Sequence, residues 1–176
     1  IESGRAPDMV RGGQFFEATH RNQKAIALNV PTPEGKEIFL KLIKESDIFI
    51  ENAKAGQWDK WGLSDEELWK VNPKLVIAHA SGFGQTGDPD YVSRGSYDPI
   101  GQAFGGTMSM NGMPDGPELN TNPFMNDYLT ALCATWSCLA AYIYAQKTGK
   151  GDSIDLAQYE TAVYFMSDAV MMWYNK

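Results

Sequence analysis

The chain has 176 residues, of which 43% are hydrophobic and 12% aromatic, so it is long and apolar enough to form one domain with a real core. Its formal net charge is -7 at pH 7, and its lysines and arginines are interspersed among the acids without a basic run. This distribution argues against a nucleic-acid partner, and any anionic ligand must be held by a local cluster of cations.

The first half of the chain alternates short apolar runs with helical patterns. Residues 1–22 are polar and glycine-rich, which is typical of a loop. Strands are predicted where apolar runs are bounded by turn residues, at residues 24–30, 47–52 and 75–80. A helix is predicted at residues 33–44, because apolar side chains recur there with helical spacing.

A second helix is predicted between the last two of these strands, since Ser64 and Glu67 form a capping box. The resulting order of strands and helices predicts an α/β fold, a Rossmann-like parallel sheet with flanking helices. In such sheets ligands bind beyond the carboxyl ends of the strands, here residues 52–62 and 81–87.

These two segments allow two interpretations. Both contain glycines and the first contains Lys54 and Lys60, as the close approach of a phosphate requires. Alternatively, the glycines only form turns and the lysines are solvated. Residues 81–87 match neither a dinucleotide-binding fingerprint nor a P-loop, so the sequence gives little support to nucleoside-triphosphate chemistry.

The second half is predicted to contain a helix from residue 99, an irregular loop at residues 108–120, a long helix at 123–147, a strand at 153–156 and a helix at 158–173. The long helix is mostly apolar, so most of its surface is expected to be buried. The methionines and aromatic residues of the last helix are expected to form core or interface surface.

Cysteine content and hydropathy bound the location of the protein. Cys133 and Cys138 lie in one apolar helical run, fit no zinc or redox spacing and could not form a relaxed disulfide, so buried free thiols in a reducing, cytoplasmic compartment are expected. No signal peptide is expected. The most apolar run, residues 131–145, is shorter than the ~20 residues that span a bilayer, and no membrane partner is expected.

Asp127 lies where a polar loop becomes the long apolar helix. Pro123 suits the first helical position and Asn122 is a plausible N-cap, which puts Asp127 near the first turn. The helix dipole there favours an ionised carboxylate, and such a group can act as a nucleophile on an acyl carbon. The alternative is that Asp127 only complements the dipole.

The remaining candidates for chemistry favour structural roles. His79 sits near the end of a buried strand without a second histidine or an acid at catalytic or metal-binding spacing, so it is expected to be a hydrogen-bonded core histidine. His20 is expected to be solvated. No serine lies in a nucleophile elbow, and no metal site is predicted.

Several short segments occur in one order along nearly the whole chain. They are Arg21-Asn22, Ile50-Glu51-Asn52, Asn72-Pro73-Lys74-Leu75-Val76, residues 81–87, Tyr97-Asp98, Asp127 and Thr148-Gly149-Lys150-Gly151. Together they resemble the family III CoA-transferases, the group that contains formyl-CoA transferase and carnitine CoA-transferase, and they are most similar to the carnitine branch.

The resemblance implies a function as an acyl-CoA:carboxylate CoA-transferase, with carnitine- or betaine-type acids as substrates. Asp127 matches the family nucleophile, which forms a mixed anhydride and then an aspartyl-CoA thioester without ATP or a metal. The family positions that contact coenzyme A correspond to Leu28, Asn52, Ala53, Lys54, Lys60, Trp61, Arg94 and Tyr97. Ala53 departs from a frequent Phe, and Lys60 and Trp61 stand where the carnitine branch has an Arg pair.

The resemblance also implies that residues 1–176 are part of a large CoA-binding, catalytic domain. A strand-helix unit before Ile1 and a smaller domain after Lys176 are then absent, and the full-length form is an interlocked homodimer. Two alternatives remain. One is an α-methylacyl-CoA racemase, disfavoured because racemases have His-Asp where this chain has Tyr97-Asp98, and the other is a non-catalytic CoA-binding fragment.

Overall fold

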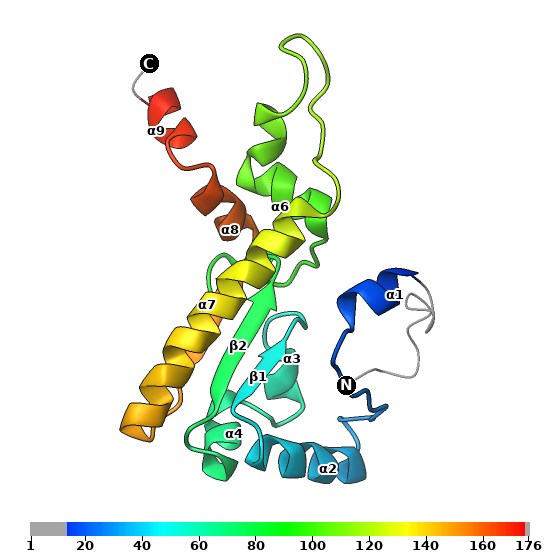
Figure 1. The fold of residues 1–176 in the computed structure, drawn as a ribbon, viewed down its shortest axis with the longest axis vertical. Helices are drawn as coiled ribbons and strands as arrows, with labels where there is room; N and C mark the ends of the chain where they lie inside the picture. Colours follow the sequence, from blue (N-terminus) through cyan, green and yellow to red (C-terminus); the bar gives the residue numbers. More distant parts are fainter. Residues whose placement is uncertain (1–13, 175–176) are drawn as a thin grey trace. The chain divides into compact units, whose positions relative to one another are not determined.

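The computed structural model describes residues 14–174, and the chain divides after Glu45 into two compact units. The first unit contains the helices α1 (Gln14–Thr19) and α2 (Pro33–Lys44) (Figure 1). Helix α2 begins as predicted, because Oγ1 of Thr32 accepts a hydrogen bond from the Gly35 N–H at 3.1 Å.

Two predictions for the first unit are wrong. The segment predicted as loop contains α1, and residues 24–30 do not form a strand but only an isolated bridge at Ala27. A strand needs a neighbouring strand for its backbone groups, and the described sheet does not include this run, whose Ile26 is exposed. Residues 1–13 of the predicted loop lie outside the described residues.

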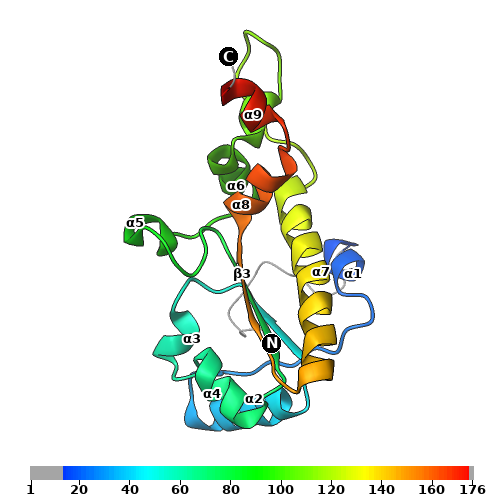
Figure 2. The ribbon, with the colours of Figure 1, turned by 90° about the vertical axis from the view of Figure 1, so that its left-hand side faces the viewer.

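The second unit is built on a three-stranded parallel sheet, which confirms the α/β prediction. The strands are β1 (Ile48–Glu51), β2 (Val76–Ser81) and β3 (Ser153–Ala157), in the order β1-β2-β3. The helices are α3 (Gln57–Lys60), α4 (Asp65–Val71), α5 (Pro89–Val92), α6 (Asp98–Gly105), η1 (Thr107–Met110), α7 (Met125–Thr148), α8 (Gln158–Phe165) and α9 (Ala169–Tyr174). Figure 2 shows α7 on one face of the sheet and α3 and α4 on the other.

The core of this unit lies between the sheet and α7. Val76 and Ala78 of β2 pack against Cys138 and Ala145, and Leu156 of β3 belongs to a second cluster with the first half of α7. Both cysteines are free and buried, as predicted, and burial raises the pKa of each thiol. Helix α7 ends at Gly149, which adopts the left-handed conformation at φ 75°.

The prediction that α7 is mostly buried is wrong. The buried positions form a single stripe, namely Asn126, Thr130, Cys133, Ala134, Cys138 and Ala145. The opposite face exposes large apolar side chains, including Leu132, Trp136, Leu139 and Ile143. The sheet, α6 and α8 pack against α7, and these side chains remain exposed within the second unit.

The length of α7 agrees with the helix predicted at residues 123–147 and exceeds the apolar run at residues 131–145. The helix has 24 residues, and by length and composition alone it could cross a membrane. The core helix of a soluble protein has the same properties, and α7 packs against β2 and β3.

Two further local predictions are only partly met. Ser64 is the N-cap of α4, but its side chain makes no capping hydrogen bond, and the Glu67 carboxylate accepts one from Lys70 instead. The predicted last helix is two helices, because Ser167 adopts φ 53° between α8 and α9. The sequence contains no glycine or proline at this break, so local rules do not detect it.

Candidate active site

Asp127 lies in the first turn of α7, as the sequence predicts. Helix α7 runs in the opposite direction to the strands, so its first turn is at the carboxyl end of the sheet, next to α6 and α8 (Figure 1). The side chain of Asp127 is exposed. A carboxylate in this place is accessible to a ligand bound beyond the strand ends.

The N-terminus of α7 is capped by Asp98 and not by Asn122. Phe124 occupies the N-cap position in a left-handed conformation and makes no side-chain cap. Oδ1 of Asp98, which is only 2% exposed, accepts hydrogen bonds from the backbone N–H groups of Asn126 at 2.7 Å and Asp127 at 3.0 Å. Two free backbone donors of the first turn are therefore satisfied by a side chain from α6.

Gln158, the first residue of α8, holds the side chain of Asp127. Its Nε2 donates a hydrogen bond to Asp127 Oδ1, and its Oε1 accepts one from Ser96 Oγ at 2.5 Å. The backbone oxygen of Gln158 accepts a hydrogen bond from Asn126 Nδ2 at 2.9 Å. Gln158 was not among the predicted site residues, although a polar side chain directly after a parallel strand is where such a contact is expected.

This arrangement requires a glycine on α6. A Cβ at Gly101 would lie 2.3 Å from Asn126 Nδ2 and 2.9 Å from Gln158 Cδ. Only the absence of a side chain at Gly101 lets α6 approach closely enough for Asp98 to reach the start of α7.

The pKa of the Asp127 carboxyl is raised from its usual value. Partial burial of the carboxyl is the largest cause and the nearby Asp98 charge adds to it, while the hydrogen bond from Gln158 acts in the opposite direction. The helix dipole, from which the sequence predicts an ionised carboxylate, favours the opposite direction. The contribution of Asp98 could not enter that argument, because Asp98 lies in a different helix.

Replacing Asp98 by alanine is expected to lower the free energy of unfolding by about 3 kcal/mol, because buried donors at the start of α7 and on Gln102 lose their acceptor. The pKa of Asp127 should fall, since a like charge is removed. Urea denaturation of the complete protein measures the first effect. The matched control is Asp115→Ala, at an exposed loop acid, and equal stability of the two variants would contradict the capping role.

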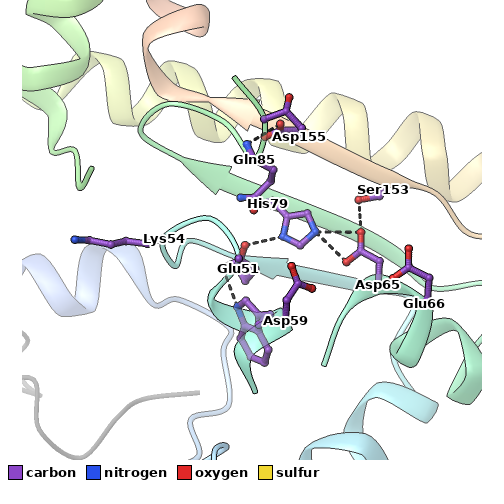
Figure 3. A pocket seen from close by; sticks show the side chains of 12 residues that line it. Glu51, Lys54, Asp59, Asp65, Glu66, His79, Gln85, Ser153 and Asp155 are labelled. Atoms are coloured by element: carbon purple, nitrogen blue, oxygen red, sulfur yellow. Dashed lines mark hydrogen bonds and ion pairs between the residues drawn. The ribbon is translucent and has the colours of Figure 1, made fainter. Parts of the chain in front are cut away.

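A second cluster of charged side chains surrounds His79 on the other face of the sheet (Figure 3). Nδ1 of His79 donates to Oε1 of Glu51 at 2.7 Å, and Nε2 donates to Oδ1 of Asp65 at 3.0 Å. Asp65 Oδ2 also accepts a hydrogen bond from Ser153 Oγ at 2.6 Å. The prediction of a hydrogen-bonded core histidine is confirmed, but its acidic partners were missed because they lie far away in the sequence.

The two carboxylates keep His79 protonated. Burial lowers the pKa of the imidazole, but the hydrogen bonds to Asp65 and Glu51 and the charges of these carboxylates outweigh it and raise the pKa to about 10. The pKa of Asp65 is lowered. Burial raises it, but the hydrogen bonds from His79 and Ser153 and the charge of His79 outweigh that effect. The cluster is thus an ion-pair network with its cation in the middle.

A cavity of about 320 Å³ adjoins this network. Its lining is rich in acidic side chains, namely Glu51, Asp59, Asp65, Glu66 and Asp155. Lys54 is the predicted CoA contact that lines it, and Figure 3 shows its side chain extending to one side of the acidic group. Among the described residues, no group of His, Cys, Asp or Glu side chains has the arrangement of a metal site.

The other predicted CoA contacts do not gather around this cavity. Asn52 and Lys60 are exposed, the Ala53 N–H donates to Glu51 Oε2 at 2.6 Å, and Trp61 packs edge-to-face on Trp58 with ring centroids 5.1 Å apart.

The remaining two of these contacts in the second unit lie between β2 and α6. Arg94 is exposed, and its guanidinium lies over the Tyr91 ring, 4.7 Å from the ring centroid. Its Nε donates a hydrogen bond to the backbone oxygen of Asp90. Tyr97 is 80% exposed. Leu28 belongs to the first unit, whose placement relative to the second is not defined.

Comparison with known proteins gives a consistent result. The sequence model of CoA-transferase family III matches residues 1–176. The chain is 50% identical over 99% of its length to bile acid CoA-transferase BaiK of Clostridium scindens and 47% identical over 96% to L-carnitine CoA-transferase of Proteus mirabilis. It spans only 40% and 42% of these two relatives.

The fold comparison agrees with the sequence comparison. A CAIB/BAIF family protein from Brucella suis superimposes with a TM-score of 0.87 at 33% identity, and the match covers 95% of this chain and 44% of that protein. The match to the family extends over every residue of the chain. The chain therefore belongs to CoA-transferase family III.

Proposed function

We propose that the protein containing this chain is an acyl-CoA:carboxylate CoA-transferase and that Asp127 is its nucleophile. The observation that carries the proposal is the placement of Asp127, an exposed carboxylate in the first turn of α7 at the carboxyl end of a parallel sheet. Asp98 is buried, and its two oxygens cap α7 and bind Gln102, whereas Asp127 is accessible to a thioester.

The reaction proceeds as two acyl shifts on one carboxylate. An oxygen of Asp127 attacks the thioester carbon, the C–S bond breaks, and CoA thiolate leaves behind a mixed anhydride. The thiolate then attacks Cγ of Asp127, which forms an aspartyl-CoA thioester and releases the first acid. A second acid reverses both steps and leaves as its CoA thioester. Since each step exchanges one activated acyl group for another, no ATP is consumed.

The family resemblance supplies the substrates and the CoA contacts of this proposal. Relatives named as bile acid and L-carnitine CoA-transferases support carboxylic acids of these types as substrates. The exposed cations Lys54, Lys60 and Arg94 would meet the phosphates of CoA, and Asn52 would line the same site. The interlocked homodimer and the cytoplasmic location belong to the same proposal.

Hydroxylamine trapping tests the proposal directly. The complete protein is mixed with acyl-CoA, quenched with hydroxylamine and digested, and the peptide masses are determined. We expect a hydroxamate on Asp127, because the nitrogen attacks the activated Cγ and CoA thiol leaves. Asp98, in the same digest, should stay unmodified. An unmodified Asp127 in protein that still exchanges CoA would overturn the covalent mechanism.

A further inference from the structure

We propose that Gln158 is a catalytic residue that distinguishes the two oxygens of Asp127. Oδ2 attacks the acyl group, while Oδ1 stays bound to Gln158 and carries the negative charge that develops when Cγ is attacked. This inference rests on the proposed function, because it assigns a role within the aspartyl-thioester reaction.

The direction of the Gln158 amide is set by its two partners. An ionised carboxylate only accepts hydrogen bonds, so the group that faces Asp127 Oδ1 must be the amide NH₂. The amide oxygen then points to Ser96, whose hydroxyl donates to it at 2.5 Å. A flipped amide would place two acceptors against each other at Asp127.

The location of the Gln158 side chain is also fixed by its surroundings. The residue is 8% exposed and begins α8 directly after β3. Its backbone oxygen accepts a hydrogen bond from Asn126, the neighbour of Asp127, and its side-chain oxygen accepts one from Ser96. The amide and the carboxylate are therefore held together before any substrate binds.

The two oxygens of Asp127 consequently differ. Oδ1 accepts the hydrogen bond from Gln158, whereas no described residue donates one to Oδ2. The free oxygen of an exposed carboxylate is the one that can approach a thioester carbon. Once Oδ2 carries the acyl group, Oδ1 becomes the carbonyl oxygen of the anhydride.

The donor then acts in the second acyl shift. Thiolate attack forms the Cγ–S bond and puts the negative charge on Oδ1, next to the Gln158 N–H. Collapse breaks the Cγ–Oδ2 bond, and Oδ2 leaves within the released acid. A preorganised donor at such an oxyanion contributes about 10²–10³-fold to the rate. In this scheme Oδ1 never leaves the protein, and only Oδ2 exchanges with the substrate acids.

Oxygen exchange tests this difference. The complete protein turns over an acyl-CoA in the presence of excess acid that carries the heavy oxygen isotope at both carboxylate oxygens. After many turnovers the protein is digested, and the mass of the peptide that contains Asp127 is measured by mass spectrometry. We expect one label in the wild-type protein. Two labels would show that the carboxylate rotates freely and would overturn the inference. No label during continued exchange would instead overturn the covalent mechanism itself.

Substitution supplies a second readout. Gln158→Met keeps a side chain of similar length without a donor, and we expect kcat to fall about 10²-fold with little change in KM, together with two labels at Asp127. The matched control is Gln146→Met, at an exposed position of α7, which should keep wild-type kcat and one label. A folded Gln158→Met protein with wild-type kcat, or with only one label, contradicts the proposal.

Discussion

The variant Asp127→Ala is expected to lose CoA transfer by about 10⁴-fold or more, since removal of a nucleophile leaves only the contribution of substrate binding. The side chain of Asp127 is exposed, so its truncation leaves no cavity and the fold should persist. Transfer is measured as exchange of a labelled acid into acyl-CoA by the complete protein. Affinity for CoA, measured by calorimetry, should remain near the wild-type value.

The control for this prediction is Asp115→Ala, which removes an exposed acid from the loop before α7. It should retain full exchange. If Asp127→Ala retained exchange as well, the nucleophile assignment would be wrong. Loss of both exchange and CoA binding would point to a role of Asp127 in binding and not in covalent catalysis.

The variant His79→Gln is expected to lower the free energy of unfolding by about 3 kcal/mol, because Glu51 and Asp65 lose the buried cation between them. The stability of the wild-type protein should also depend on pH in a defined way. The pKa of His79 is raised from 6.5 to about 10 on folding. The contribution of His79 to the free energy of unfolding is therefore complete below pH 6.5 and declines as the pH rises toward 10.

At acidic pH, stability is expected to change in the opposite direction and to fall as the pH falls. The pKa of Asp65 is lowered on folding, so its contribution is present above the usual value of 3.8 and is lost as the pH falls below it. Urea denaturation across this range should show a smaller alkaline decline in His79→Gln than in the wild-type protein. His20→Gln, in the first unit, is the matched control and should keep the wild-type decline. Equal declines in both variants would refute the role of His79.

The sequence predicted where helices begin more reliably than it predicted the hydrogen bonds that cap them. The Thr32 cap of α2 joins residues only three apart, at the start of a helix that the sequence predicts. The Asp98 cap of α7 joins residues 28 apart, and the same separation divides His79 from Glu51. No local rule relates such pairs, because the folding of the whole unit brings them together.

Which apolar side chains are buried was also decided by the tertiary structure. Apolar content made α7 look like a helix surrounded by core, yet the sheet covers one stripe and leaves Trp136 and Ile143 exposed. The apolar run at residues 24–30 had the composition of a strand but no place in the described sheet. In both cases the number of neighbours decided the outcome, and composition does not contain that number.

The sequence by itself determined the parallel α/β order, the family and the placement of Asp127 in the first turn of the long helix. These depend on hydrophobic period and on motifs, which are properties of consecutive residues. Only the tertiary structure decided that Asp98 caps this helix, that Gln158 engages one oxygen of Asp127, and that His79 stays charged between two carboxylates. The physical reason is that the charge, capping and direction of a polar side chain depend on partners that meet only after the chain has closed its loops.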